Sequence, residues 1–505
     1  MLAKVRTCAV VGLDGFVIDA EVDIAPGLPA FNIVGLPDTA VQEARERVRA
    51  AIRNSGCEFP MRRITVNLAP GDLRNAGPSY DLPIAVGILV SSGQVPEFNG
   101  PALFLGELAL DGTLRHTAAM LPMVSVAMDQ QIDTVFVPRV DATEASLIHD
   151  LAILPADNLA QLVSHLRGDS MISPYQNGSK ATENGHGPKA SIDFSHIKGQ
   201  ESAKRALEVA AAGGHNILMT GPPGSGKTLL ARSLPSVMPE MTFQESLEVT
   251  KIYSVSGLLP SDSPFLSYRP FRSPHYTISN AGLVGGGRIP RPGEITLSHR
   301  GVLFLDELPE FGHSALEALR QPIEDKVVTI SRAGGTLTFP ANFALVGAMN
   351  PCPCGYYTHP IKECVCSAGA VARYQKRISG PLLDRMDIFT EVPPVDYDKL
   401  AGLGDSEPSS AVRARVKEAR DIQEARFEGS GFKYNSEMGP AEVWKYCHTE
   451  ESAMHLLRNA MNQYNLSARA FHRVLKLSLT IADLGKSDLI KTEHLAEALQ
   501  YRTRG

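Results

Sequence analysis

The 505-residue sequence has few cysteines, few aromatic residues and no long apolar run. Seven cysteines in a chain of this length exclude a scaffold held together by disulfides. The longest clean apolar run, Ile84–Val90, is far shorter than the roughly 20 residues that a membrane-spanning helix needs. Asp14 and Asp19 interrupt any apolar segment near the N-terminus that could act as an export signal. We therefore expect a cytoplasmic protein with no membrane segment.

An excess of charge of one sign is also missing, because the net charge is only −6. Residues 1–168 carry 12 basic and 19 acidic residues, 169–400 carry 22 of each, and 401–505 carry 15 basic and 14 acidic. Bulk charge alone therefore argues against any nucleic-acid binding, and the acidic N-terminal part is the least expected place for it. Any DNA site must be a local patch, for example on loops that line a ring.

What is present is the composition of a globular protein, with 43% hydrophobic and 21% charged residues and a length that predicts two or three domains. A stretch at 169–190 is rich in Gly, Ser, Asn, Lys and Pro and has no apolar periodicity, which is typical of a linker. We predict an α/β domain at 1–168, a second α/β domain at 191–400, and a helical domain at 401–505.

Apolar patterns support this division. Short apolar runs bounded by glycine and proline predict strands in the first domain, at 8–12, 64–68, 102–105 and 134–137. Apolar residues at helical spacing predict a helix there at 39–54. Buried-type strands separated by helices predict a parallel sheet in the second domain, with strands at 216–220, 301–305 and 343–349. Helical periodicity dominates the last hundred residues, at 411–427, 450–463, 467–484 and 492–501.

A glycine-rich segment between a predicted strand and a predicted helix indicates a nucleotide site. Glycines let backbone N–H groups turn toward a phosphate, and the helix N-terminus adds partial positive charge. The lysine of this pattern is expected to bridge the β- and γ-phosphates of ATP, and the threonine hydroxyl to hold Mg²⁺. A glycine-rich turn that matches by chance is the alternative. The eight residues are Gly221, Pro222, Pro223, Gly224, Ser225, Gly226, Lys227 and Thr228.

An acidic pair follows the next buried strand, with its aspartate 79 residues after Lys227. Asp306 and Glu307 come directly after four apolar residues, at the strand end that faces the nucleotide in a parallel sheet. Asp306 suits Mg²⁺ binding, directly or from the second shell, and Glu307 suits positioning the water that attacks the γ-phosphate. With the phosphate loop, this pair predicts ATP hydrolysis rather than binding alone.

Two further polar residues are candidates for contact with the γ-phosphate. Asn350 follows the third apolar strand, where its amide could contact that phosphate or orient water; a turn residue before Pro351 is the alternative. Arg385 precedes a short strand and could be an arginine finger that reaches a neighbouring subunit's γ-phosphate. From position alone, an ion pair of Arg385 with Asp384 or Asp387 is equally compatible.

These elements, in this order and with a helical domain behind them, resemble the AAA+ ATPases. The segment 272–294, RSPHYTISNAGLVGGGRIPRPGE, and the run LSHRGVLFLDELPEF that follows it closely are more specific. They resemble the magnesium-chelatase-like AAA+ proteins, and within them the YifB/ComM family, whose members are bacterial. The resemblance covers essentially the whole chain and implies an ATPase that uses ATP and Mg²⁺.

The resemblance also assigns roles by position. Arg385 matches the family's arginine finger, and Asn350 matches its sensor-1 residue. Arg469 falls where related proteins place a sensor-2 arginine on the lid helix, with Arg473 one turn further on as the second candidate. These arginines and Asn350 complete the expected catalytic set with Lys227 and the acidic pair.

Extra elements in the ATPase core are suggested by the long gap between the lysine and the acidic pair. For this clade the resemblance implies a helix-2 insert, here near 282–288, and a hairpin before sensor 1, here 328–337, both pointing into the pore of a ring. Arginines on these loops would then contact DNA phosphates, each adding salt-dependent affinity. As bare sequence, arginines on glycine-rich loops are more often simply solvated. The three arginines are Arg288, Arg291 and Arg332.

The N-terminal domain resembles the proteolytic domain of Lon proteases, and Gly77-Pro-Ser79 matches the motif around that family's nucleophilic serine. In Lon the base is a lysine, and alignment on the Lon pattern puts Leu121 at that position. No lysine occurs between Lys4 and Lys180. Because a serine hydroxyl without a base stays protonated and inert, we expect a non-proteolytic interaction or assembly domain.

Four of the seven cysteines form two C-x-C pairs: Cys352, Cys354, Cys364 and Cys366. Four thiolates brought together would satisfy tetrahedral Zn²⁺, although the spacing is tighter than the usual C-x₂-C and His359 could replace one ligand. Reduced cysteines in a loop, or a redox-labile pair, are the alternatives. The position directly after Asn350 predicts that a structural zinc would shape a loop rather than take part in chemistry.

Two functions of different classes fit these observations. The resemblance implies a homo-hexameric helicase that uses ATP to drive branch migration on single-stranded and branched DNA, extending the integration of incoming DNA in natural transformation, alongside recombination proteins. The alternative is a protein-remodelling ATPase of the chelatase type that acts on a protein partner. An ATP-dependent protease is disfavoured by Leu121. DNA-stimulated ATP hydrolysis would separate the first two.

Overall fold

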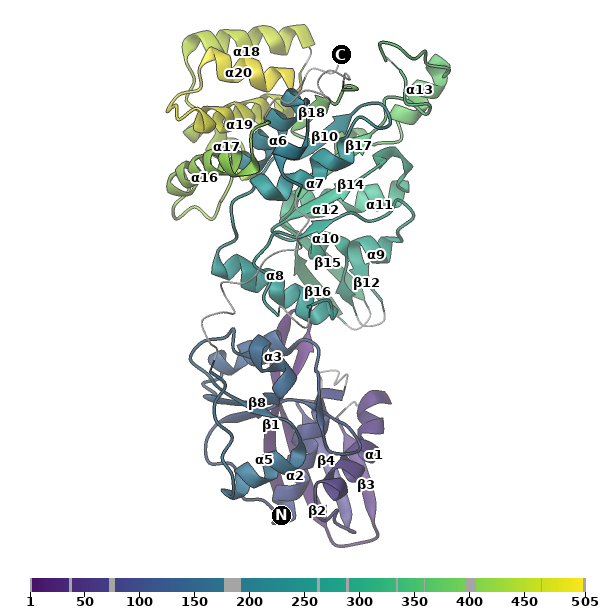
Figure 1. Cartoon of the computed structure of the whole chain (residues 1–505), viewed down its shortest axis with the longest axis vertical. Coiled ribbons are helices and arrows are strands. Elements are labelled where there is room, and N and C mark those ends of the chain that lie inside the picture. Colours follow the sequence, from purple (N-terminus) through teal and green to yellow (C-terminus); the bar gives the residue numbers. More distant parts are fainter. Residues whose placement is uncertain are drawn as a thin grey trace. The chain divides into compact units, whose positions relative to one another are not determined.

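A computed structural model of the chain describes residues 2–35, 39–71, 78–176, 192–260, 264–287, 290–332, 335–357, 359–395, 406–464 and 466–502 (Figure 1). The chain forms two compact units, Met1–Gly185 with Ser246–Leu266, and His186–Glu245 with Ser267–Gly505. The domain boundaries that we predict around the linker and at residue 400 stay predictions. Within the described residues, no helix has both the length and the apolar character that crossing a bilayer requires.

The first unit is built on a seven-stranded mixed sheet with the order β3-β4-β2-β1-β5-β8-β9. β2 runs antiparallel to β1 and β4, and the remaining neighbours are parallel. The strands are β1 (Leu2–Val11), β2 (Asp14–Ala25), β3 (Ala30–Val34), β4 (Arg63–Ala69), β5 (Ala102–Phe104), β8 (Thr134–Pro138) and β9 (Ala152–Ala156). A separate short hairpin consists of β6 (Glu107–Leu108) and β7 (Leu114–Arg115).

Helices cover both faces of this sheet at the parallel strands β5, β8 and β9, which are buried almost throughout, whereas β1, β2 and β4 largely alternate between buried and more exposed residues. In β5, Leu103 belongs to one hydrophobic cluster while its neighbours Ala102 and Phe104 belong to the other, because successive side chains point to opposite faces. One cluster takes in α1, α2 and α5, and the other takes in α3 and α4. The helical elements are α1 (Thr39–Asn54), η1 (Pro78–Tyr80), α2 (Asp81–Ser91), α3 (Met120–Asp129), η2 (Arg139–Asp141), α4 (Ala142–Ala145) and α5 (Leu159–Arg167).

A segment from much later in the chain completes the first unit. α8 (Phe243–Ser256) places Ser254 with its hydroxyl 2.6 Å from the carboxylate of Glu144, and the Ser254 carbonyl accepts a bond from the Ala119 N–H at 3.2 Å. Phe265, at 6% exposure, packs into the cluster of α3 and α4. No pattern in the sequence signals this packing.

The second unit contains a five-stranded parallel sheet with the order β11-β14-β17-β10-β18, which confirms the predicted sheet. β14 and β17 are buried along their whole length, as expected for strands covered on both faces. The strands are β10 (Ile217–Thr220), β11 (Phe271–Arg272), β14 (Val302–Leu305), β17 (Ala344–Met349) and β18 (Ile388–Glu391).

Helices and two hairpins surround this sheet. The helical elements are η3 (Phe194–His196), α6 (Glu201–Gly213), α7 (Lys227–Val237), α9 (Asn280–Val284), α10 (Glu294–Leu297), η4 (Leu308–Glu310), α11 (His313–Ala318), α12 (Arg320–Asp325), α13 (Ala368–Gln375) and α14 (Gly380–Leu383). The hairpins pair β12 (Gly285–Gly286) with β13 (Arg291–Pro292), and β15 (Val327–Arg332) with β16 (Gly335–Pro340). The second hairpin confirms the one predicted before sensor 1.

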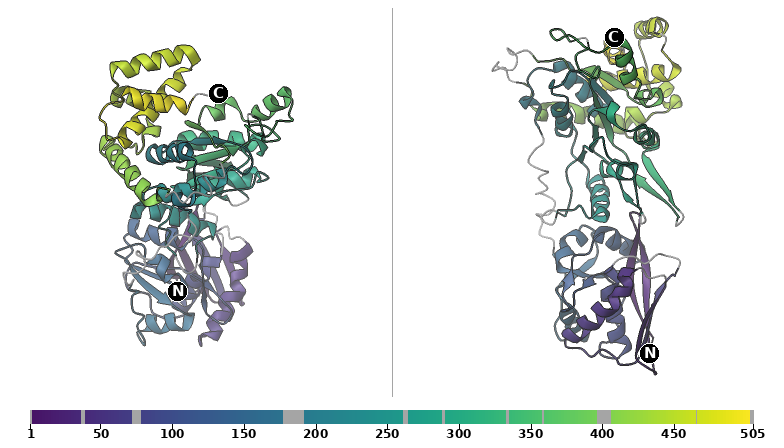
Figure 2. Two further views of the ribbon diagram at one scale, coloured as in Figure 1. Left: turned by 45° about the horizontal axis from the view of Figure 1, so that its top comes forward. Right: turned by 90° about the vertical axis from the view of Figure 1, so that its right-hand side faces the viewer.

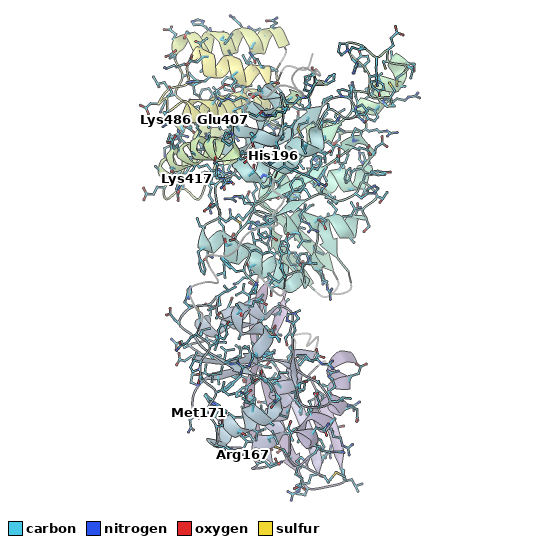
Figure 3. The ribbon with its side chains drawn as sticks, in the orientation of Figure 1. Arg167, Met171, His196, Glu407, Lys417 and Lys486 are labelled. Carbon is cyan, nitrogen blue, oxygen red and sulfur yellow. The ribbon has the colours of Figure 1, made fainter. Side chains whose placement is uncertain are left out.

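The C-terminal helices form a layer beside α6 and α7 in the same unit (Figure 2). They are α16 (Ser409–Arg426), η5 (Asn435–Glu437), α17 (Pro440–Tyr446), α18 (Glu451–Tyr464), α19 (Ala468–Leu484) and α20 (Thr492–Gln500). They share one hydrophobic core with the parallel sheet, and Arg415 of α16 lies 2.7 Å from Glu208 of α6. Charged side chains such as Lys417 and Lys486 project from the outer surface of this layer (Figure 3).

Candidate active site

The predicted phosphate loop joins β10 to α7 at the carboxyl end of the parallel sheet. Gly224 and Gly226 have φ angles of 78° and 93°, in a region that glycine adopts with little cost. Gly221 has no room for a side chain, because a Cβ there would lie 2.2 Å from the carbonyl oxygen of Val392. The backbone therefore has the conformation and the close packing that curl N–H groups around a phosphate.

Lys227 opens α7 and is 8% exposed. Its Nζ donates to the carbonyl oxygens of Gly221 at 2.7 Å and Pro222 at 2.9 Å, and to Oδ1 of Asn350 at 3.2 Å. Burial lowers the pKa of Lys227, and the nearby acidic pair opposes that shift. Because an ammonium group has three protons, a phosphate oxygen must replace one of these acceptors when it binds.

Thr228 and Asp306 approach each other across the loop. The Thr228 hydroxyl donates to Oδ2 of Asp306 at 2.8 Å. Two neighbouring oxygen ligands of an octahedral Mg²⁺, each about 2.05 Å from the ion, lie about 2.9 Å apart. The hydroxyl and the carboxylate therefore fit the predicted magnesium site.

Glu307 follows Asp306 with its backbone in the left-handed region, at a φ of 52°. This conformation is uncommon for a residue other than glycine and costs roughly 1–2 kcal/mol. The turn separates the two carboxylates, because Asp306 contacts Thr228 while Glu307 is exposed. The arrangement fits the predicted division between metal binding and water positioning, which stays a prediction.

Asn350 lies where the third strand ends, and its side chain contacts the phosphate-loop lysine. The loop is also tied to this strand by the Gly221 N–H, which donates to the carbonyl of Met349 at 3.2 Å. This contact between Asn350 and Lys227 favours the sensor interpretation over a simple turn residue.

Arg385 lies at the amino-terminal ends of the strands, on the side of the sheet opposite to the phosphate loop. Asn216 immediately precedes β10, and its side chain donates to the Arg385 carbonyl at 3.1 Å. The guanidinium lies 2.5 Å from Glu324 and donates to the carbonyl of Pro381 at 2.7 Å. Among the described residues its Nε has no hydrogen-bond partner although it is buried. The structure thus pairs Arg385 with Glu324, a partner that the sequence does not suggest, rather than with Asp384 or Asp387.

A cavity of about 570 Å³ at this edge contains Arg385 and Arg473 among its lining residues. Arg473 donates to the Met386 carbonyl at 3.2 Å and lies 3.5 Å from Asp387. Burial alone would raise the pKa of Asp387, but the His215 ring, with its Nδ1 3.5 Å from the carboxylate, and the charge of Arg473 hold it well below its usual value. Arg469 is exposed, and it is not among the residues that line this cavity. The sensor-2 assignment stays a prediction, and this geometry favours Arg473.

Four further cations that sequence reasoning missed line the same cavity, beside Arg385 and Arg473. The basic residues are Arg300, Lys326, Arg385, Lys433, Arg473 and Lys476, and the carboxylates are Glu324, Asp387 and Glu437. They come from segments spread over nearly 180 positions, so no local motif could have indicated that they meet. The excess of cations makes this edge a candidate surface for an anionic group.

The loops expected to contact DNA are partly described. Arg291 is exposed on β13, and Arg332 ends β15; Arg288 lies outside the described residues, as does the environment of the Arg332 side chain. The two hairpins touch, because a Cβ on Gly285 of β12 would lie 3.0 Å from the side chain of Ile330 in β15. The elements that carry these arginines are therefore neighbours.

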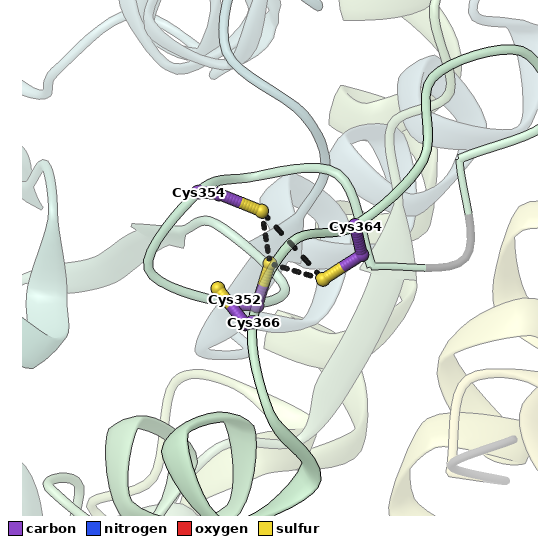
Figure 4. A group of neighbouring side chains, drawn as sticks. All are labelled: Cys352, Cys354, Cys364 and Cys366. Atoms are coloured by element: carbon purple, nitrogen blue, oxygen red, sulfur yellow. Dashed lines mark hydrogen bonds between the residues drawn. The ribbon is translucent and has the colours of Figure 1, made fainter.

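The four cysteines come together directly after Asn350 (Figure 4). The sulfur of Cys352 lies 3.4 Å from that of Cys354 and 3.6 Å from that of Cys364, and the latter two are 3.6 Å apart. These three sulfurs and that of Cys366 all lie within 4.8 Å of one another. Sulfurs bound to zinc at 2.3 Å in a tetrahedron lie about 3.8 Å apart, whereas a disulfide needs about 2.05 Å. The backbone N–H of Tyr356 lowers the pKa of the Cys354 thiol to about 6, whereas in Cys364 and Cys366 desolvation and the neighbouring thiols outweigh a backbone hydrogen bond and raise the pKa.

This cluster is therefore compatible with a zinc site. His359 is not part of it: its Nδ1 instead accepts backbone N–H groups from Ile361 at 3.1 Å and Lys362 at 2.9 Å. The donor set of four sulfurs matches that of structural rather than catalytic zinc, which keeps an open position.

Among the residues that the structure describes, no comparable set of partners surrounds the serine motif of the first unit. Ser79 is 8% exposed, and Gly77 lies outside the described residues. Leu121 is fully buried in the cluster of α3 and α4, and its N–H donates to the buried carboxylate of Glu144 at 2.8 Å. The position that would carry a catalytic lysine is thus part of a packed apolar core.

Family profiles match the chain in three stretches. The profile described as magnesium chelatase, subunit ChlI, matches residues 193–400. The profile of subunit ChlI of Mg-chelatase matches 20–141, and that of the ChlI C-terminal region matches 406–502. Together they cover the first sheet from within β2 to β8, the parallel sheet and the C-terminal helices, and a ChlI-type AAA+ domain implies ATPase activity.

Relatives that match over nearly their full length support the same family. Competence protein ComM of Haemophilus influenzae is 43% identical over 505 residues, which cover 99% of this chain and 97% of the relative. The YifB proteins of Salmonella typhimurium and Escherichia coli are 42% identical over 507 residues and 41% identical over 508 residues, with the same coverage. The chain therefore belongs to the YifB/ComM family of magnesium-chelatase-type AAA+ ATPases.

Proposed function

We propose that this chain forms a homo-hexameric cytoplasmic ring that hydrolyses ATP to drive branch migration of DNA during the integration of single-stranded DNA by homologous recombination. One observation carries the proposal. The phosphate loop and its lysine lie at the carboxyl edge of the parallel sheet, whereas Arg385 lies at the amino edge in a cavity rich in cations. An ATPase subunit with these two faces is complete only when it meets another copy.

The phosphate loop and Arg385 are too far apart to form one site within a subunit, so each would complete the site of a neighbouring copy. β10 joins the edges with four residues, and a parallel strand of that length spans about 13 Å. Arg385 starts beyond the amino end of β10, where Glu324 and Pro381 hold its guanidinium. We infer that Arg385, with Arg473 or Arg469, faces the γ-phosphate on a neighbouring subunit and stabilises the charge that develops there.

Within one subunit the residues of the phosphate loop would bind and orient ATP. Lys227 exchanges one of its three acceptors for a phosphate oxygen, and the Asn350 amide released in this way can contact the γ-phosphate. Mg²⁺, held by Thr228 and Asp306, would neutralise phosphate charge. Glu307 is exposed at the same strand end and would orient the attacking water.

Two features support DNA as the substrate. The hairpins that carry Arg291 and Arg332 are adjacent, so that a ring of subunits would present a repeated set of cations to a phosphate backbone. Such contacts grip DNA without reading its sequence. The relative from Haemophilus influenzae carries the name of a competence protein.

A second candidate function is the remodelling of a protein partner. The matched profiles are described as a magnesium chelatase subunit, and they span all three parts of the chain. A remodelling ATPase would need the same phosphate loop and the same arginine finger. It would not need the arginines of the hairpins to contact phosphates.

The test is ATP-driven branch migration on a labelled three-strand or four-way junction. We expect migration by the wild-type protein, none with Lys227→Ala, and loss of migration with retained basal ATPase in Arg332→Ala. Arg167→Ala, at an exposed position of the first unit (Figure 3), is the matched control and should migrate normally. Absence of both migration and DNA-stimulated hydrolysis, from protein shown to form rings, would overturn the DNA proposal and favour the protein partner.

A further inference from the structure

The cysteine cluster is connected to the nucleotide loop through the backbone. Asn350, whose amide accepts a hydrogen bond from Lys227 at 3.2 Å, is separated from Cys352 by Pro351 alone. Cys352 is fully buried, and its sulfur accepts the N–H of Tyr357 at 3.3 Å. A shift of the Cys352 sulfur would therefore displace Asn350, which contacts Lys227 of the phosphate loop.

A second contact joins the cluster to the loop from another direction. Gly355 has a φ of 83°, and a Cβ built on it would lie 2.4 Å from Cδ of Pro223, inside the phosphate loop. The Gly355 N–H donates to the Cys352 carbonyl at 3.0 Å. The turn that begins at Cys352 and continues through Cys354 thus places Gly355 directly against Pro223.

Hydrophobic burial does little to hold this loop in shape, and its hydrogen bonds, such as those from the Ile361 and Lys362 N–H groups to His359, are local. Of the described residues between 351 and 367, only Cys352 and Gly355 are buried, and these are the two that link the cluster to the nucleotide loop. Ile361 and Val365 are 85% and 87% exposed, so they contribute almost no hydrophobic stabilisation. Bonds to a common metal would supply the missing constraint, because a tetrahedral thiolate site fixes four chain positions at once.

We propose that a zinc-class divalent cation held by the four thiolates controls the affinity of the nucleotide loop, by fixing Asn350 and the contact between Gly355 and Pro223. The inference rests on the proposed ATPase site. Coupling of two binding sites is reciprocal, so ATP must tighten metal binding by the same factor by which the metal tightens ATP binding. Coupling between sites is typically about 5- to 150-fold, and we expect at least about tenfold here.

The experiment measures the dissociation constant of a fluorescent ATP analogue on the full-length protein in three states: zinc-loaded, stripped by a chelator, and reloaded with zinc. We expect stripping to weaken nucleotide binding at least tenfold and reloading to restore it. In the reverse experiment, ATP should slow the release of zinc to a chromogenic chelator. The two coupling factors should agree.

Gly355→Ala separates the coupling from the integrity of the metal site, since it keeps all four cysteines. A side chain there collides with Pro223 and is strained at a positive φ. We expect zinc at wild-type stoichiometry, weak nucleotide binding, and a coupling factor near one. Gly369→Ala is the matched control, because a Cβ at Gly369 meets nothing within 4 Å.

Each outcome is decisive. Equal nucleotide affinity with and without zinc, on protein that remains folded by circular dichroism, would overturn the coupling and leave the ATPase proposal intact. A chain that binds no zinc would overturn it as well. Failure of the wild-type protein to bind any nucleotide would instead overturn the proposed ATPase site.

Discussion

Two small-residue motifs, one in each unit, have very different surroundings. The phosphate loop of the second unit delivers Lys227 to three acceptors and places Thr228 against Asp306. The serine motif of the first unit delivers Ser79 to the start of α2, but the position expected to carry its base is the fully buried Leu121. Both motifs precede a helix in an α/β unit, yet the described contacts bring together a set of reactive partners only around the first.

The difference shows that a motif acquires chemistry from the side chains that meet it. A serine hydroxyl needs a neighbouring base, and an apolar leucine cannot accept its proton. A glycine-rich loop needs an acidic pair and a polar sensor at adjacent strand ends, which the parallel sheet supplies. The following predictions test this contrast, from the largest expected effect to the smallest.

Lys227→Ala should remove both nucleotide binding and hydrolysis, lowering ATPase activity by at least about 10³-fold, because no other cation replaces its contact with the β- and γ-phosphates. Steady-state phosphate release and binding of a fluorescent ATP analogue would measure it. Lys417→Ala, on the exposed surface of α16, is the control and should behave as wild type. Normal activity in Lys227→Ala would remove the basis for the contrast.

Arg385→Ala should lower kcat by about 10³-fold while leaving nucleotide affinity close to wild type, because the arginine acts on the developing charge of the transition state. Arg377→Ala, which breaks an exposed ion pair with Glu310, should have little effect.

Rings assembled from two different variant subunits test whether Arg385 acts on the nucleotide of a neighbouring subunit. Rings that combine Arg385→Ala and Lys227→Ala subunits contain some interfaces with an intact phosphate loop and an intact finger. Such mixtures should regain part of the ATPase activity. No recovery in rings shown to contain both variants would place Arg385 and its phosphate in one subunit.

Leu121→Ala should lower the free energy of unfolding of the first unit by about 2–5 kcal/mol, the cost of a cavity in a packed core. Chemical denaturation followed by near-ultraviolet circular dichroism would measure it. Leu110→Ala is the control, since Leu110 is 57% exposed, and should change stability by less than about 0.5 kcal/mol. Equal stability of the two variants would mean that Leu121 is not a packing residue.

Ser79→Ala should have the smallest effect, changing ATPase activity by less than about twofold, because the position expected to carry the activating base is the buried Leu121. Wild type and variant should both leave casein intact over an extended incubation with ATP. Casein cleavage that disappears in Ser79→Ala would erase the distinction between the two motifs.

Much of the fold could be predicted from local patterns. The helix predicted at 39–54 has the bounds of α1, and the four predicted C-terminal helices coincide with α16, α18, α19 and α20 to within two residues at each end. Strand ends, and with them the positions of Asp306 and Asn350, follow from short apolar runs that stop at a polar residue. Periodicity of this kind depends only on neighbours in the sequence, so it can be read without knowing the tertiary structure.

The sequence by itself determined the phosphate loop, the acidic pair, the parallel sheet that aligns them, and the absence of a lysine near the serine motif. Only the tertiary structure decided that Arg385 lies at the far edge of the sheet beside Glu324, and that Gly355 presses on Pro223. It also decided that a helix following the phosphate-loop helix completes the first unit through Ser254 and Glu144. These contacts join residues that lie between 61 and 132 positions apart, and no periodic pattern connects them. They arise because buried polar groups need partners and packed surfaces need complementary shapes, and both are satisfied only when the whole chain has folded.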